Sequence, residues 1–210
     1  LMINLFSYLI HDGFVNNFDL IQDKLIDYCY KEKEKFTTGY GNSKGLKVSN
    51  GENSWHSEKN YYENTILSET VQLFLNNYFD KNNIFKDGTG FCMNSLWFMI
   101  NSKGGYNHRH KHFDKVDCAL SGVFWIKVPK NPGNIIFYNP EEYRNYQLNE
   151  SYSNIIKNIF NQKSSYQISP QEGKIILFPS HLDHSVDKNF SDEDRISISF
   201  NINIQPPKYG

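Results

Sequence analysis

The second half of the chain is a series of short β-rich runs separated by turn residues, and this series restricts the possible folds more than any other feature. The run "RISISFNINI" (195–204) alternates strictly, with isoleucine or phenylalanine at every second position from 196 onward. Such alternation predicts a strand with one buried face. About eight strands are expected, at 95–102, 108–114, 118–129, 134–140, 165–170, 174–180, 184–187 and 195–204. Many short strands with regular turns predict a sandwich or barrel.

The first part of the chain, about residues 1–90, predicts helices joined by loops. Amphipathic helices are expected over 18–35 and 64–79, because apolar residues recur there near a helical period. The second helix has a predicted apolar stripe of Leu67, Thr70, Val71, Phe74 and Tyr78. The segment 37–57 is rich in Gly, Asn and Ser and predicts a loop. We expect one domain over the whole chain, 1–210, with this helical part packed on a β core at about 91–205.

Composition and charge exclude several classes of function. The net charge of −1 gives no electrostatic reason to expect a nucleic-acid or anionic-membrane partner. Cys29, Cys92 and Cys118 are far apart, so neither a disulfide framework nor a thiolate zinc site is expected. The opening "LMINLFSYLIHDG" lacks the basic start and the cleavage site of a signal peptide, and no apolar run approaches transmembrane length. A cytoplasmic location is the default expectation.

The stretch "YNHRHKHFDK" (106–115) places His108, His110, His112 and Asp114 at alternating positions. In an extended chain these side chains share one face. His112 and Asp114 flank a single residue, so both can reach one metal ion, with His184 in "FPSHLDHSV" as the candidate third ligand. Two histidines and one carboxylate form the facial site of non-haem iron(II) oxygenases. The alternative is a solvated strand edge, where charged side chains block aggregation.

A second candidate feature is Arg195, which begins the alternating strand and shares its polar face with Ser197. If that face lines a barrel, the guanidinium is buried and requires a carboxylate. The alternative is a surface ion pair with the acidic residues at 192–194. The functional interpretation is a dicarboxylate cosubstrate, held by Arg195 and Ser197 at one end and bound to the metal at the other.

Six segments occur in the order and with the gaps typical of one family. They are "SNGENSWHS" (49–57), "WFMINSKGGYNHRHKH" (97–112), "LSGVFWIKVP" (120–129), "GNIIFYNP" (133–140), "GKIILFPSHLDHSV" (173–186) and "RISISFNI" (195–202). In these segments the chain resembles the 2-oxoglutarate/Fe(II)-dependent oxygenases of an uncharacterised bacterial and phage type. The resemblance implies a mainly β fold with flanking α-helices and a double-stranded β-helix (jelly-roll, cupin-like) core. It also implies Fe(II), the cosubstrate 2-oxoglutarate and O₂.

The resemblance assigns His184 as the distal histidine ligand and Arg195 as the cosubstrate arginine, with no catalytic residue expected beyond the metal ligands. His110 and His112 match the two histidines of the family segment "H-HP-S", but "FDKVDCA" inserts extra residues before "LSG". Two ligand sets therefore remain open, His112/Asp114/His184 and His110/His112/His184. We favour the first, because a carboxylate adds negative charge and a hard oxygen ligand for Fe(II).

Two further histidines are weaker candidates. His181 stands where the family tends to have Trp, so it lines the substrate mouth or is simply exposed. His108 is expected at the surface or behind the ligands.

The expected reaction is hydroxylation of a C–H bond of a small-molecule or peptide substrate, with release of succinate and CO₂. One alternative is a cupin-like metal enzyme that uses three histidines without 2-oxoglutarate. The other is a non-catalytic β-barrel module that binds a small molecule or peptide. No nucleic acid and no membrane is expected as a partner, and the sequence leaves the prime substrate and the oligomeric state open.

Overall fold

The structure is a computed structural model that describes residues 8–37, 53–57, 65–83, 89–112, 118–140 and 164–205. Two helices and ten strands lie in these ranges, with a short 3₁₀ helix between the first strand and the first helix. In chain order they are β1 (His11–Phe14), η1 (Phe18–Leu20), α1 (Gln22–Thr37), β2 (Ser54–His56), α2 (Ile66–Lys81), β3 (Gly90–Asn101), β4 (Asn107–His110), β5 (Leu120–Lys127), β6 (Ile135–Tyr138), β7 (Ser165–Ile168), β8 (Lys174–Pro179), β9 (His184–Val186) and β10 (Arg195–Gln205).

The strands form two antiparallel sheets. The larger sheet has the order β1-β8-β5-β10-β3-β2, and the smaller has the order β4-β9-β6-β7. Apolar side chains of both sheets, among them Trp125 and Phe178 from the larger and Phe137 from the smaller, form one buried cluster. The two sheets therefore pack face to face, as in a double-stranded β-helix. This confirms the fold class expected from the sequence.

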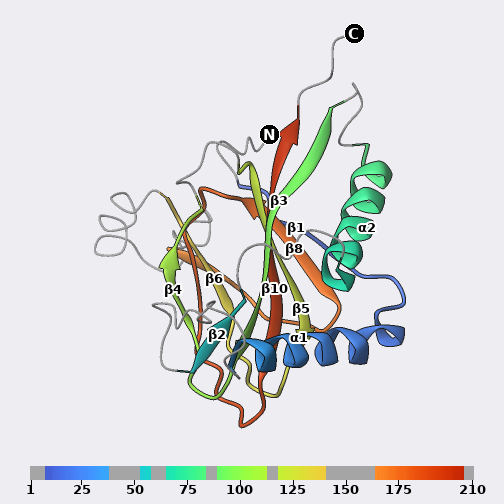
Figure 1. Cartoon of the computed structure of the whole chain (residues 1–210). Helices are drawn as coiled ribbons and strands as arrows, with labels where there is room; N and C mark the ends of the chain where they lie inside the picture. The colour runs from blue at the N-terminus through green and yellow to red at the C-terminus, as the bar shows by residue number, and fades with distance from the viewer. Residues whose placement is uncertain are drawn as a thin grey trace, which may run out of the picture.

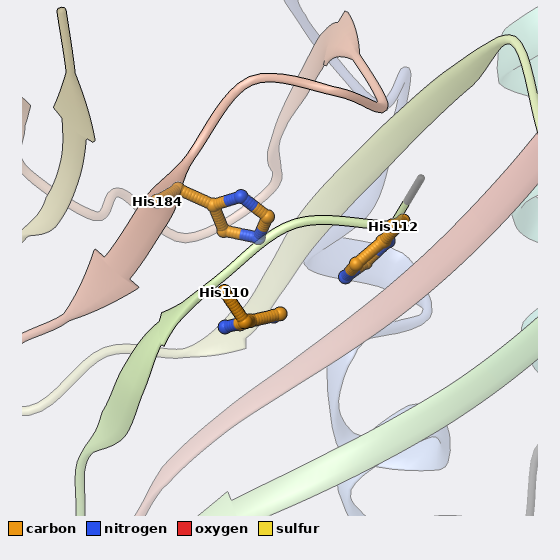
Figure 2. Close-up of side chains that lie close together, drawn as sticks. All are labelled: His110, His112 and His184. Atoms are coloured by element: carbon orange, nitrogen blue, oxygen red, sulfur yellow. The ribbon is translucent and has the colours of Figure 1, made fainter. Parts of the chain in front are cut away.

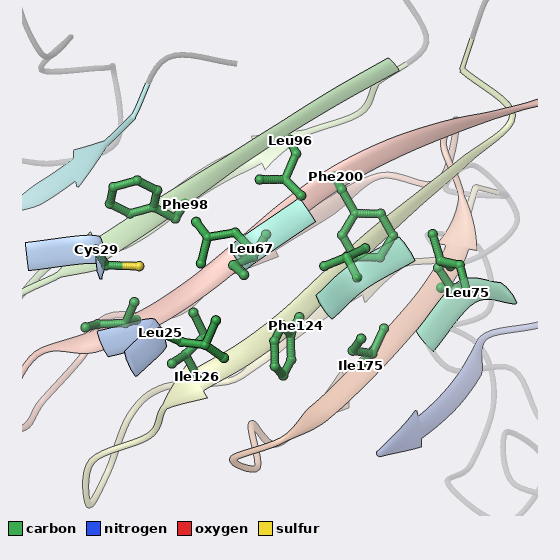
Figure 3. Packing of buried hydrophobic residues seen from close by; sticks show 14 of the residues in the cluster. Leu25, Cys29, Leu67, Leu75, Leu96, Phe98, Phe124, Ile126, Ile175 and Phe200 are labelled. Carbon is green, nitrogen blue, oxygen red and sulfur yellow. The ribbon is translucent and has the colours of Figure 1, made fainter. Parts of the chain in front are cut away.

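The outer face of the larger sheet is covered by the two helices. In Figure 1, α2 lies on one side of β3, β10 and β5, and β4 and β6 lie on the other. Figure 3 shows Leu25 of α1 and Leu67 of α2 with the sheet residues Phe124 and Phe200, and all four side chains are fully buried in one cluster. The alternating apolar residues of β10 face these helices. Its other residues, including Arg195, therefore face the smaller sheet.

The helices begin later than the sequence pattern predicts. The segment 18–35 becomes η1 followed by α1, which begins at Gln22. α2 begins at Ile66, because the side chain of Thr65 and that of Ser68 form a capping box before it. The buried residues of α2 are Leu67, Ser68, Val71, Leu75 and Phe79. Leu67 and Val71 are thus buried as predicted, whereas Leu75 and Phe79 are buried in place of the predicted Phe74 and Tyr78.

All eight predicted strands are present, with shorter bounds in most cases. β1 and β2 were not predicted, because strands of four and three residues carry too little alternation to detect. β2 lies at the end of the predicted loop 37–57, so that prediction is wrong there. Within the described ranges, neither helix is both long enough and apolar enough to cross a lipid bilayer.

Candidate metal centre

Three histidines from two segments of the chain meet at one end of the smaller sheet. His110 is the last residue of β4 and His184 is the first residue of β9, and the two lie directly opposite each other in this antiparallel pair. His112 follows β4 by two residues. One ligand nitrogen of each side chain lies within 4.8 Å of the other two. Figure 2 shows the three imidazoles gathered around one common space.

The position of His112 depends on contacts beyond the end of β4. Its backbone N–H donates to the carbonyl of Ser180, just after β8, at 2.9 Å. The chain is thereby held close to the larger sheet, and the His112 ring lies 5.1 Å from that of His110 and 5.2 Å from that of His184 between centroids. The rings of His110 and His184 are 4.3 Å apart. The three rings are therefore close enough to share one ion.

Each of the three imidazoles has a carbonyl oxygen beside its Nδ1. The partners are the backbone oxygen of His108 for His110 (2.7 Å), that of Leu182 for His184 (2.9 Å), and Oδ1 of Asn201 for His112 (2.8 Å). A carbonyl oxygen can only accept, so each Nδ1 carries its hydrogen. The lone pair of a neutral imidazole then lies on Nε2, which is the form that binds a metal. This donor set fits a divalent metal ion.

Burial keeps the innermost histidine neutral. His184 is 4 % exposed. Its removal from water, and secondarily the neighbouring His110, lower the pKa of His184 from 6.5 to about 3. His184 is therefore uncharged at neutral pH and needs no deprotonation to bind a metal.

The guanidinium of Arg195 is buried between the sheets, where the side chain is only 1 % exposed. Its Nη1 donates to the backbone oxygens of Pro132 and Asp187. Its Nη2 is buried and has no hydrogen-bond partner among the described residues. Burial lowers the pKa of Arg195 to about 10, with Asp187 partly opposing the shift, so the group stays protonated at neutral pH. A buried cation with an unused donor fits a carboxylate ligand.

The acidic residues that precede Arg195 have other partners. Asp192 pairs with Lys103 at 2.6 Å, and Glu193 lies 3.6 Å from Lys127. Asp194 accepts hydrogen bonds from Tyr30 and Ser102. The alternative of a surface ion pair for Arg195 is therefore not what the structure contains. Ser197 is buried on the same face of β10, two residues further on.

The guanidinium and the histidine cluster are linked through β9. His184 begins this strand and Asp187, whose backbone oxygen binds Arg195, follows its end. Three residues of extended chain span about 10 Å. The cluster and the guanidinium are thus held at a fixed spacing along one short strand.

The remaining predicted residues divide into two groups. Asp114 lies outside the described residues. His108 and His181 are exposed and lie outside the three-histidine cluster, His108 against Tyr106 and His181 against Tyr8. Sequence reasoning missed Asn201, which contacts His112, because a polar residue on an alternating strand is equally typical of a solvent-exposed face.

The two-sheet fold thus places a histidine cluster that could hold a metal at one end of β9 and a buried arginine near its other end. A family model described as "Putative 2OG-Fe(II) oxygenase" matches residues 95–201, slightly more than half of the chain. The chain belongs to this family. It is therefore a 2-oxoglutarate/Fe(II)-dependent oxygenase, and its cofactors are Fe(II), 2-oxoglutarate and O₂, as the sequence predicted.

Solved structures of similar fold include several oxygenases. A prolyl-4-hydroxylase from Pseudomonas putida has a TM-score of 0.60 and 12 % identity, over 94 % of this chain and 93 % of that one. The 2-oxoglutarate complex of a viral collagen prolyl hydroxylase from Paramecium Bursaria Chlorella virus-1 has a TM-score of 0.55 and 14 % identity, over 93 % and 94 %. HygX from Streptomyces hygroscopicus, with nickel, 2-oxoglutarate and hygromycin B bound, has a TM-score of 0.53 and 10 % identity, over 96 % and 83 %. At such low identity these likenesses show the fold alone. No curated protein sequence matches the chain.

Proposed function

We propose that this oxygenase hydroxylates a C–H bond of a small-molecule or peptide substrate and releases succinate and CO₂. The observation that carries the proposal is the unused, buried Nη2 of Arg195, which is held at one end of β9 while the histidine cluster lies at the other. Fe(II) with 2-oxoglutarate and O₂ supplies the oxidation: one oxygen atom enters the substrate as hydroxyl, and the other enters succinate. The residues of this chain bind and orient the metal, the cosubstrate and the substrate, and they exclude water from the site.

For the metal we propose His110, His112 and His184 as ligands. Three imidazoles on one side of an octahedral ion leave three positions for cosubstrate and O₂. His112 and His184 belong to both ligand sets that the sequence left open. Asp114 as the third ligand stays a prediction. The variants His110→Ala and Asp114→Ala distinguish the two ligand sets, because tight Fe(II) binding should be lost only in the variant that lacks the third ligand.

For the cosubstrate we propose that Arg195 and Ser197 bind the carboxylate far from the metal. Nη1 of Arg195 is held by two backbone carbonyls, so the guanidinium is already oriented before the ligand arrives. Arg195 is buried, so little water reaches its guanidinium. Exclusion of water strengthens the charge-assisted hydrogen bond to the carboxylate.

The test is an anaerobic titration of the metal-free protein with Fe(II) and then with 2-oxoglutarate. We expect a metal-to-ligand charge-transfer absorption band, and succinate formation once O₂ is admitted. Iron binding without any band or succinate would instead support the cupin-like enzyme without 2-oxoglutarate, which the three-histidine geometry also suits. Loss of iron binding in His184→Ala, with the fold retained, is the matching control.

The substrate class is tested by a panel. Solved structures of similar fold include prolyl hydroxylases and an enzyme with hygromycin B bound, so proline-containing peptides and aminoglycosides are suitable first members. Hydroxylation is read as a mass increase of one oxygen atom in the substrate, matched by succinate. A product that lacks this added oxygen, formed with equal succinate, would contradict hydroxylation but not the oxygenase chemistry.

A further inference from the structure

A row of polar side chains crosses the inner face of the larger sheet behind His112. Asn201 of β10 lies directly opposite Ser95 of β3 on one side and Ser121 of β5 on the other. Directly opposite residues in a sheet place their side chains on the same face, within contact distance. The row therefore has Asn201 at its centre, with His112 as its neighbour towards the cluster.

The hydrogen bonds of Asn201 determine which neighbouring groups donate and which accept. Its Oδ1 lies 2.8 Å from Nδ1 of His112 and accepts from the hydroxyl of Ser121 at 2.8 Å. Its Nδ2 donates to the hydroxyl of Ser95 at 2.9 Å. Because an amide oxygen can only accept, Nδ1 of His112 must be the donor. Nε2 of His112 then carries the lone pair.

The hydroxyl of Ser121 is a second neighbour of Nδ1 of His112. The Ser121 hydroxyl lies 2.9 Å from Nδ1 of His112, and on its own it could donate to that nitrogen and favour the opposite tautomer. The single hydrogen of this hydroxyl can go to Oδ1 of Asn201 or to the hydroxyl of Ser180, and because Asn201 makes Nδ1 of His112 the donor, the Ser121 oxygen can only accept from His112. Ser121 further contacts the hydroxyl of Ser180, and both serines are buried. The donor role of His112 Nδ1 is therefore fixed by the amide oxygen of Asn201.

We propose that Asn201 is a positioning residue for the metal centre, which holds His112 in the Nδ1–H tautomer and directs Nε2 into the histidine cluster. The inference rests on the proposed role of His112 as a ligand. It does not depend on the third ligand, because His112 belongs to both candidate sets. Partners behind metal-bound histidines typically change metal affinity about 10- to 100-fold when they are removed.

The experiment uses Co(II) as the metal probe and three variants of the full chain. Asn201→Leu removes the acceptor at nearly constant volume. Asn201→Asp keeps an acceptor oxygen at the same place. Asn203→Leu is the matched control, since Asn203 lies two residues further along β10, opposite Cys92. Circular dichroism and thermal unfolding of the metal-free proteins establish that each variant is folded.

We expect Asn201→Leu to bind Co(II) at least about tenfold more weakly than the parent, and Asn201→Asp and Asn203→Leu to stay close to it. In the proton NMR spectrum of the Co(II) protein, one shifted, exchangeable imidazole N–H signal should be lost or broadened in Asn201→Leu alone. A purely structural role would not change that signal.

Two results would overturn the proposal. The first is a folded Asn201→Leu that binds Co(II) within twofold of the parent and keeps every imidazole N–H signal. The second is an Asn201→Asp variant that is folded yet as weak as Asn201→Leu, because the acceptor would then not be what matters. A parent protein that binds no Co(II) would instead overturn the proposed metal site as well.

Discussion

Replacement of Arg195 by methionine isolates the cosubstrate site from the metal site. Arg195 is buried, its Nη1 is held by the backbone oxygens of Pro132 and Asp187, and its Nη2 has no partner among the described residues. Binding of a carboxylate would add one charge-assisted hydrogen bond and a partner for a buried cation. Because the guanidinium is already ordered, little of this gain is lost as conformational entropy.

The expected magnitude follows from these contacts. Hydrogen bonds to charged groups contribute roughly 1.5–3 kcal/mol, and loss of a buried charge pair costs about 2–5 kcal/mol. We therefore expect Arg195→Met to weaken 2-oxoglutarate by about 2–4 kcal/mol, which is roughly 30- to 1,000-fold in Kd. Fe(II) affinity should change less than about twofold, because the substitution leaves the three histidines in place.

The assay is the anaerobic titration followed through the charge-transfer band, with Fe(II) affinity measured separately. Lys127→Met is the matched control, since it removes a cation at the end of β5 that pairs with Glu193 at the surface. That control should leave the Kd for 2-oxoglutarate unchanged. An Arg195→Met protein that binds Fe(II) normally and 2-oxoglutarate within twofold of the parent would refute the assigned role of this arginine.

Three further predictions concern single residues. Gly133 has φ +77°, and a Cβ there would lie 2.7 Å from the backbone oxygen of Asp187 that holds Arg195; Gly133→Ala should weaken 2-oxoglutarate severalfold in the same titration, and unchanged affinity would contradict this. The pKa of His184 is lowered to about 3, so as the pH falls below 6.5 the unfolded chain takes up a proton that the folded chain does not. The metal-free protein should therefore lose up to about 1.4 kcal/mol per pH unit in urea unfolding between pH 6 and 4.5, more than His184→Gln loses; equal losses would exclude this cause. A Cβ on Gly122 would lie 2.2 Å from the Phe200 ring, whereas one on Gly90 meets nothing nearer than 3.8 Å. Gly122→Ala should thus lower stability by about 1–3 kcal/mol in thermal unfolding and Gly90→Ala much less, and similar losses would be evidence against this packing.

The strands could be predicted because alternation reports burial directly. In β10 the even-numbered apolar residues face the helices. The odd-numbered residues, including Arg195, therefore face the interior between the sheets, and Arg195 is buried there. These inferences need only the local sequence and the two faces of a strand.

The details of the site could not be predicted in the same way. His112 reaches His184 through a hydrogen bond from its backbone to Ser180, a residue far away in the sequence. The role of Asn201 depends on which residues of β3 and β5 lie opposite it. Both facts depend on the register between distant strands, and a polar residue on an alternating strand is equally typical of a solvent-exposed face.

The length of the short strand β9 bears on which 2-oxo dicarboxylic acid can serve as the cosubstrate. One of its ends carries a candidate iron ligand, and the peptide group just past the other end fixes the guanidinium. That separation is determined by peptide geometry, which deforms far less readily than a side chain. If His184 and Arg195 have the roles proposed above, we expect oxaloacetate, with one methylene fewer, and 2-oxoadipate, with one more, to support less turnover than 2-oxoglutarate.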